Sequence, residues 1–168
     1  MKRACPVVFV AMLVIAGCNA PSPTPPDPLH GAWRMVEMYW ILADGDTVAA
    51  PAHESLFLFS DGFYSIGYAF GRERMEAYAE RWHPTDAEKA TRFSSMIVNA
   101  GTYELHGSRI HATPLFALAP AFVGGEAEFF YTFTGDTLEL SWDQSVAFDG
   151  LEYPGRGIVT LHRLVRLD

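Results

Sequence analysis

The sequence predicts an all-β fold in which eight short antiparallel strands form a barrel or a sandwich. Eight apolar or alternating runs lie between residues 33 and 167, and turn-forming pairs such as Asp61-Gly62 separate several of them closely. Where apolar and polar residues alternate, one face of the strand is apolar. One apolar face per strand suits a single sheet that closes on itself, so we expect the barrel.

The first 29 residues predict a signal peptide and a tether. Lys2 and Arg3 precede an apolar run over 6–16, which at about 11 residues is shorter than the ~20 that span a bilayer. The run ends in Ile15-Ala16-Gly17-Cys18. This segment resembles the bacterial lipobox, which implies cleavage before Cys18 and acylation of its thiol. The alternative is an ordinary signal peptide with an incidental cysteine.

A proline-rich segment follows Cys18. Residues 19–28 contain five of the eleven prolines, which favours an extended stalk of roughly 30 Å. We therefore expect a signal peptide over 1–17, a lipidated cysteine and linker over 18–29, and one domain over 30–168. By resemblance to bacterial sorting signals, Asn19 after the cysteine implies anchoring in the outer membrane, facing the periplasm.

Charge and cysteine content narrow the classes of partner. The chain has 168 residues with 12 basic and 20 acidic side chains, a formal net charge of −8. This balance argues against nucleic acid, because neutralising phosphates requires a basic face. The two cysteines are Cys5 and Cys18, so the mature domain has no disulfide and must be stabilised by packing alone. We expect a monomer.

The strands follow in order along the domain. They are 33–42, 55–60, 63–70, 102–105, 109–118, 127–134, 137–142 and 157–167. Turns at Asp61-Gly62, 106–108 and Gly135-Asp136 join three pairs of them into hairpins. Three alternating sets are expected to share a buried face: Phe129, Tyr131 and Phe133; Leu138, Leu140 and Trp142; and Val159, Leu161, Val165 and Leu167.

A helical insertion is predicted between the third and fourth strands. Two stripes at helical spacing lie there: Met75, Tyr78, Ala79 and Trp82, then Ala90, Phe93, Ile97 and Ala100. Pro84 ends the first stripe. Thr85 and Glu88 form a capping box that opens the second helix, and Gly101 is placed to end it. The insertion either covers the outer wall of the barrel or forms a lid over its mouth.

Three segments carry a family resemblance. Gly31-Ala32-Trp33 matches the lipocalin G-x-W motif, and residues 99–105 and 135–140 look like segments of the bacterial lipocalin-like domain family. The resemblance covers nearly all of residues 30–168. It implies that Trp33 closes the barrel base under a basic residue of the last strand. Arg163 and Arg166 are available there, and we assign Arg163 because it interrupts an apolar face.

The sequence contains no recognisable catalytic motif, and we expect no cofactor and no metal site. His106 and His111 flank one turn, but without an obvious third ligand a surface pair is the simpler interpretation. Aromatic side chains with polar tips are instead the candidates for lining a pocket. They are Tyr64, Tyr68, Tyr78, Trp82, Tyr103, Tyr131 and Trp142.

Three functions are compatible with these observations. The first is a lipid-anchored envelope protein whose lipocalin-like barrel binds a small hydrophobic molecule or lipid. The second is a structural or interaction lipoprotein with a filled barrel. The third is a cyclase or isomerase that shapes its substrate inside the barrel. The first is preferred because the aromatic set suits a pocket for an apolar, partly polar molecule.

Overall fold

A computed structural model of the chain describes residues 27–71, 76–153 and 158–167. Its strands are β1 (Gly31–Ile41), β2 (Thr47–Ala50), β3 (Ser55–Ser60), β4 (Phe63–Ala69), β5 (Met96–His106), β6 (Arg109–Ala117), β7 (Glu126–Thr134), β8 (Thr137–Val146) and β9 (Val159–Arg166). A helix, α1 (Asp86–Ser94), and a short 3-10 helix, η1 (Pro120–Phe122), lie between strands. The predicted signal peptide, Cys18 and most of the linker lie outside the described residues.

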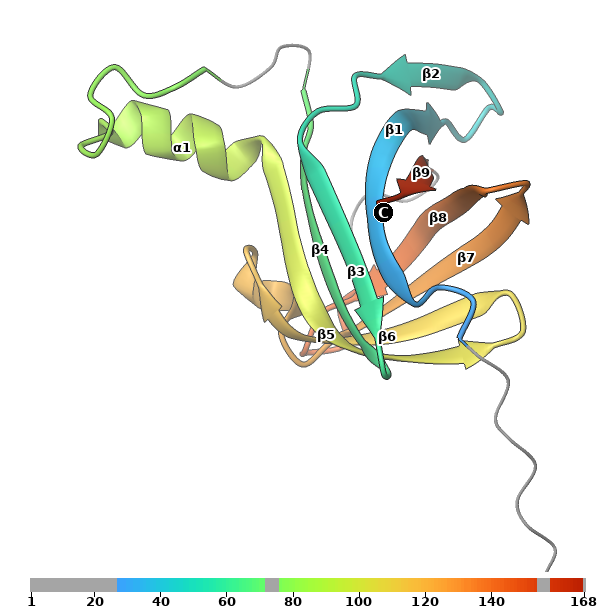
Figure 1. The fold of residues 1–168 in the computed structure, drawn as a ribbon. Coiled ribbons are helices and arrows are strands. Elements are labelled where there is room, and N and C mark those ends of the chain that lie inside the picture. The colour runs from blue at the N-terminus through green and yellow to red at the C-terminus, as the bar shows by residue number, and fades with distance from the viewer. Residues whose placement is uncertain (1–26, 72–75, 154–157, 168) are drawn as a thin grey trace, which may run out of the picture.

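The strands form a closed antiparallel barrel (Figure 1). Neighbours in the sheet follow chain order from β3 to β9, and β1 pairs with both β3 and β9. β2 is an extra short strand that pairs with the end of β1 and lies outside the ring. The predicted eight-stranded barrel is therefore confirmed, and β2 is an additional strand that was not predicted.

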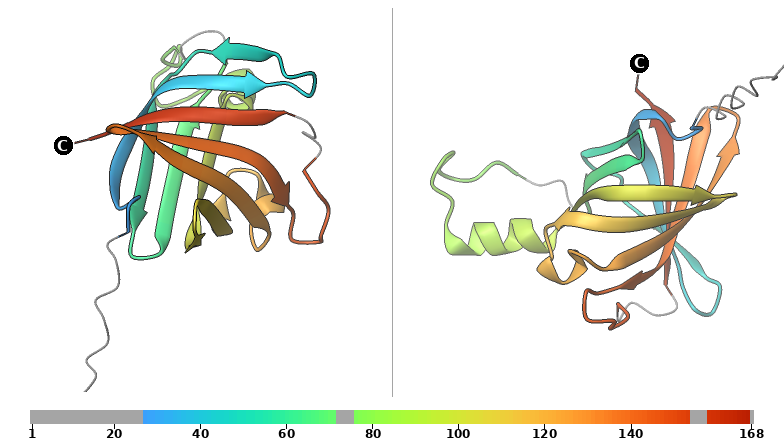
Figure 2. Two further views of the ribbon diagram at one scale, coloured as in Figure 1. Left: turned by 90° about the vertical axis from the view of Figure 1, so that its right-hand side faces the viewer. Right: turned by 90° about the horizontal axis from the view of Figure 1, so that it is seen from below.

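The three predicted hairpin turns gather at one end of the barrel, which we call the closed end. Asp61 and Gly62 both have positive φ, 50° and 80°, as the tight turn between β3 and β4 requires. Gly107 and Gly135 occupy the other two turns, also with positive φ. The opposite end, where α1 and η1 lie, is the open end (Figure 2).

Strand pairing decides which residues face the interior. In β8, Leu138 and Leu140 are buried, as predicted. The prediction for β9 is wrong, because Thr160, His162 and Leu164 are the buried residues there. His162 lies opposite Met38 of β1 and Leu140 of β8, and directly opposed residues point to the same face of a sheet. The apolar set Val159, Leu161 and Val165 therefore faces outward.

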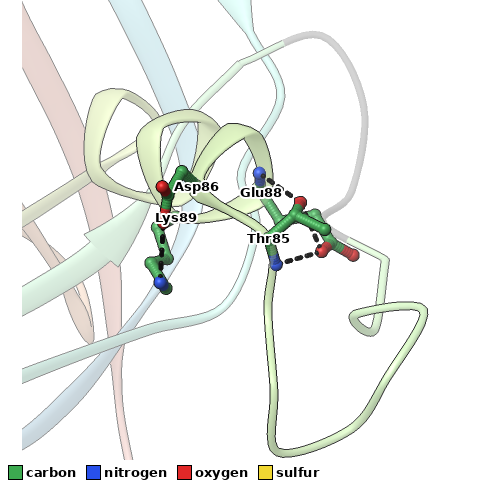
Figure 3. A network of polar contacts seen from close by, with 4 residues as sticks. All are labelled: Thr85, Asp86, Glu88 and Lys89. Carbon is green, nitrogen blue, oxygen red and sulfur yellow. Dashed lines mark hydrogen bonds and ion pairs between the residues drawn. The ribbon is translucent and has the colours of Figure 1, made fainter.

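The beginning of α1 agrees with the predicted capping box (Figure 3). The Glu88 amide donates to Thr85 Oγ1 over 3.3 Å, and the Thr85 amide donates to a Glu88 carboxylate oxygen over 2.7 Å. The backbone amide of Ala79 donates to the same carboxylate. These hydrogen bonds lower the pKa of Glu88, because they favour its ionised form.

The rest of the predicted insertion is wrong in two places. Residues 76–82 form no helix, although Pro84 does precede α1; Met75 lies outside the described residues. α1 ends at Ser94, and residues 96–101 belong to β5. Gly101 does not end a helix but lies in β5, where a Cβ would collide with the Thr113 carbonyl oxygen of β6. Pairing of β5 with β4 and β6 gives this segment interstrand hydrogen bonds that a longer helix would forgo.

The placement of α1 does not fit a cover over the outer wall of the barrel. The helix projects away from the barrel beside the open end (Figures 1 and 2), and it contains no buried residue. It therefore does not cover the outer wall, and its contact with the open end is Phe93, which lines a cavity there. Neither helix among the described residues is long and apolar enough to cross a bilayer.

Candidate binding site

The closed end of the barrel is filled around Trp33. This side chain is only 1% exposed, and its indole Nε1 donates to the Leu29 carbonyl over 2.8 Å. The Phe133 ring centroid lies 6.0 Å from that of Trp33. The guanidinium carbon of Arg166 lies 4.1 Å from the Trp33 ring centroid, which is a cation–π contact.

Arg166, and not Arg163, is thus the basic residue that packs on Trp33. Arg163 lies on the outer face of β9, where it donates to Glu37 and Glu139 over 2.8 Å each. The assignment fails because Arg163 lies between the buried His162 and Leu164 and so has the opposite parity. Arg166 lies two residues after Leu164, so it points to the same face of β9 as Leu164, at the closed end.

Arg166 also explains the glycine of the Gly31-Ala32-Trp33 motif. Gly31 has a φ of +131°, which L side chains rarely adopt, and a Cβ there would collide with the Arg166 guanidinium. The same guanidinium donates to the His30 carbonyl. The glycine, the tryptophan and the arginine therefore form one structural unit.

A cavity of about 220 Å³ opens at the other end of the barrel. Its lining is mainly aromatic and aliphatic. Five lining residues carry a polar group: Tyr68, Asn99, Ser145, Tyr153 and His162. The apolar part of the lining is Phe57, Ile66, Phe70, Phe93, Met96, Ile97, Val98, Leu118, Ala119, Phe122, Ala127, Phe129 and Trp142. A second hollow of about 200 Å³ shares Tyr68, Phe70, Ile97, Trp142 and Tyr153 with the first, so the two adjoin.

The polar member of this lining with the least access to solvent is His162. The side chain is 2% exposed, and its ring lies 5.0 Å from the Tyr68 ring and 5.7 Å from the Phe57 ring. Burial lowers the pKa of His162 to about 4, because a charged imidazole would lose its hydration there. Its Nδ1 lies 3.3 Å from the Leu140 carbonyl oxygen, whereas Nε2 has no hydrogen-bond partner among the described residues.

The other polar groups of the lining are also uncharged. Asn99 Oδ1 accepts a hydrogen bond from the Tyr64 hydroxyl over 2.6 Å, and Ser145 Oγ accepts one from the Trp142 indole over 2.9 Å. Burial raises the pKa of Tyr68, so its hydroxyl stays neutral. No Asp, Glu, Lys or Arg among the described residues lines either hollow.

The predicted aromatic set divides between the cavity and other places. Tyr68 and Trp142 line the cavity. Tyr64 is buried behind it and holds Asn99, while Tyr103 packs edge-on against Phe59 and donates to Asp27.

The remaining three members lie outside the cavity lining. The Tyr131 hydroxyl donates to the Gly107 carbonyl in a closed-end turn over 3.0 Å. Tyr78 and Trp82 do not reach the lining, and Trp82 is 82% exposed.

Of the lining residues, the predicted set contained Tyr68 and Trp142. Two of the polar residues that it lacked, His162 and Asn99, have an identifiable reason. His162 was missed because the apolar residues that flank it were assigned to the interior. Asn99 was missed because residues 85–100 were read as helix. Val159, Leu161 and Val165 are more apolar than Thr160 and His162, so hydropathy favours the wrong face of β9. Pairing with β1 and β8 identifies the inner face.

A metal site is not among the features of the described residues. No group of three or more His, Cys, Asp or Glu side chains is close enough in these ranges to hold an ion. His106 lies 3.5 Å from the Glu104 carboxylate, and both side chains are exposed. This is a surface contact.

Comparison with known proteins identifies the family. The profile of the lipocalin-like domain matches residues 30–163, while no curated protein matches the chain. Among solved structures, a lipocalin-like protein from Bacteroides uniformis is similar, with a TM-score of 0.42 and 15% sequence identity over 83% of this chain and 98% of that chain. Because the family profile spans most of the sequence, from the G-x-W segment to the last strand, the chain belongs to the lipocalin-like domain family.

Proposed function

We propose that the barrel binds a small, uncharged and mainly apolar molecule in the cavity at its open end. The observation that carries this proposal is the cavity itself, about 220 Å³ with an apolar wall and no charged side chain among its described lining residues. Small-molecule sites are concave and mostly apolar, with a few polar groups that fix orientation. The lining of this cavity has that composition.

The cavity also distinguishes binding from the two alternative functions. A purely structural barrel needs no hollow, and the closed end around Trp33 demonstrates how the same fold fills its interior. A barrel-type cyclase or isomerase requires an acid or a base. His162 faces the cavity, but with a pKa of about 4 it is a weak base at neutral pH, and no carboxylate lines the described part of the wall.

The binding proposal is tested with neighbouring residues of β7. Phe129 lines the cavity, whereas Phe130 lies on the outer face beneath Arg109, whose guanidinium carbon is 5.0 Å from the ring centroid. An apolar fluorescent dye is titrated into the full-length Cys18→Ser protein and into Phe129→Ala and Phe130→Ala variants of it. Losing roughly 50 Å² of apolar contact costs about 1.4 kcal/mol, or about tenfold in Kd.

We expect this loss for Phe129→Ala and no change for Phe130→Ala. Equal dye affinity in both variants would place the dye on the surface. That result would favour the alternative of a structural or interaction lipoprotein.

The same proposal includes a lipid anchor on Cys18 and a place at the periplasmic face of the outer membrane. It is supported by the Ile15-Ala16-Gly17-Cys18 segment, by Asn19 and by the proline-rich stretch that follows. Stable anchoring takes more than one acyl chain, which an acylated N-terminal cysteine supplies.

Replacement of each cysteine in turn tests the anchor. Cys18→Ser should release the protein from washed membranes, whereas Cys5→Ser, within the predicted signal peptide, should leave it there. Retention of Cys18→Ser in the membrane pellet after a high-salt wash contradicts the anchor.

A further inference from the structure

A residue of the cavity wall carries an unpaired hydrogen-bonding atom. Nε2 of His162 is inaccessible to solvent and has no hydrogen-bond partner among the described residues. Buried polar atoms are paired in the large majority of cases, and an unpaired one costs about 1–3 kcal/mol. His162 lines the cavity, so a bound molecule is the natural source of a partner.

The other ring nitrogen determines what kind of partner Nε2 requires. Nδ1 lies 3.3 Å from the Leu140 carbonyl oxygen, and a carbonyl oxygen only accepts, so Nδ1 carries the proton. In a neutral imidazole the second nitrogen then has a free lone pair and accepts a hydrogen bond. Nε2 of His162 therefore requires a donor.

The neighbours of His162 do not supply that donor. The closest rings, Tyr68 and Phe57, contact it through ring edges and faces. The Ser145 hydroxyl accepts from the Trp142 indole and, like the Tyr68 hydroxyl, makes no hydrogen bond to Nε2. Asn99 lines the same cavity; its Oδ1 accepts from the Tyr64 hydroxyl, so its amide nitrogen is the group left to donate.

We infer that the ligand is an uncharged apolar molecule with a hydroxyl group at its buried end, and that this hydroxyl donates to Nε2 of His162. The inference rests on the proposed function, because it names the chemical class of molecule that the cavity takes. A hydroxyl also has lone pairs, which suit the amide nitrogen of Asn99. The apolar remainder contacts the aromatic wall.

Two related classes of molecule fit less well. An ether or ester of the same length has only acceptors, so it leaves the lone pair of Nε2 unpaired. A carboxylate also only accepts, and pairing with it would require a charged His162, which burial opposes. No cation among the described lining residues would balance that carboxylate.

Three ligands with a common ten-carbon chain test the inference. 1-Decanol, decyl methyl ether and decanoate are used at pH 7 to displace a fluorescent apolar dye from the full-length Cys18→Ser protein. The same titrations are made with His162→Phe and with the control His106→Phe, whose side chain is exposed at the closed end. The readout is the ratio of the Kd for the ether to the Kd for the alcohol, because the ratio cancels effects common to both ligands.

We expect that ratio to be about tenfold larger in the parent protein and in His106→Phe than in His162→Phe. Decanoate should bind more weakly than decanol to the parent. An unchanged ratio in His162→Phe overturns the inference, and so does tighter binding of decanoate, while either leaves the proposed function standing. Failure of all three ligands to displace the dye overturns both.

A second measurement keeps the test decisive if His162→Phe does not fold. The imidazole ¹⁵N resonances of His162 are followed in the parent protein during titration with decanol and with the ether. Decanol should shift the unprotonated Nε2 resonance, and the ether should shift it much less. Equal shifts with both ligands overturn the hydroxyl assignment.

Discussion

Burial of His162 makes the stability of the barrel depend on pH. An unperturbed histidine has a pKa of about 6.5, and burial lowers the pKa of His162 in the folded protein to about 4. Between these two values the unfolded chain binds a proton that the folded protein does not. The free energy of unfolding therefore decreases as pH falls below about 6.5, and this contribution levels off below about 4.

The size of the effect follows from the difference between the two pKa values. At about 1.4 kcal/mol for each unit of pKa, a lowering from 6.5 to about 4 is equivalent to roughly 3 kcal/mol. The nearest ionisable side chain, Tyr68, stays neutral throughout, because burial raises its pKa. The Leu140 carbonyl does not titrate. The change between pH 7 and pH 4 at this position thus belongs to His162.

Urea unfolding at several pH values measures this contribution. The parent protein and His162→Phe are compared at pH 7, 6, 5 and 4, with His106→Phe as the control for an exposed histidine. We expect the parent to lose about 3 kcal/mol relative to His162→Phe over this range, while carboxylates shared by both proteins cancel. Parallel pH profiles for the parent and His162→Phe would refute the burial of a neutral His162.

Three further comparisons test the packing. Trp33→Ala should lower the free energy of unfolding by about 3–5 kcal/mol, as measured by urea unfolding, because it removes a buried indole; a loss under about 1 kcal/mol would contradict its position. Arg166→Ala should lower the free energy of unfolding by about 1 kcal/mol, because the cation–π contact is lost. Arg163→Ala should lower it less, because the ion pairs of Arg163 are exposed to solvent. A larger effect of Arg163→Ala would contradict the assignment. Gly101→Ala should cost roughly 1–3 kcal/mol, since its Cβ meets the Thr113 carbonyl, and an unchanged urea midpoint would refute the close approach of β5 and β6.

The features that the sequence predicted correctly depend on contacts between near neighbours. Asp61-Gly62 forms its turn because both residues adopt positive φ. Thr85 and Glu88 cap α1 because residues three apart meet across its first turn. Both outcomes are determined within a few residues, so no knowledge of the rest of the fold is needed.

The errors involve residues whose environment is supplied by distant strands. Ile97 and Ala100 continue a helical stripe from Phe93, yet both belong to β5, which pairs with β4 and β6. Local periodicity cannot weigh a short helix against hydrogen bonds to two partner strands. Trp82 completes a helical stripe as well, but no described surface buries it, and a short isolated helix is only marginally stable in water.

By itself, the sequence determined the number of barrel strands, their hairpin turns, the helical cap and the position of the G-x-W segment at the start of the first strand. Only the tertiary structure decided that His162 rather than Leu161 faces inward, that Arg166 rather than Arg163 covers Trp33, and that a cavity remains at the open end. A one-residue change of register exchanges the two faces of a strand. When both faces carry apolar residues, as in β9, the register comes from pairing with β1 and β8, which lie far away in the chain.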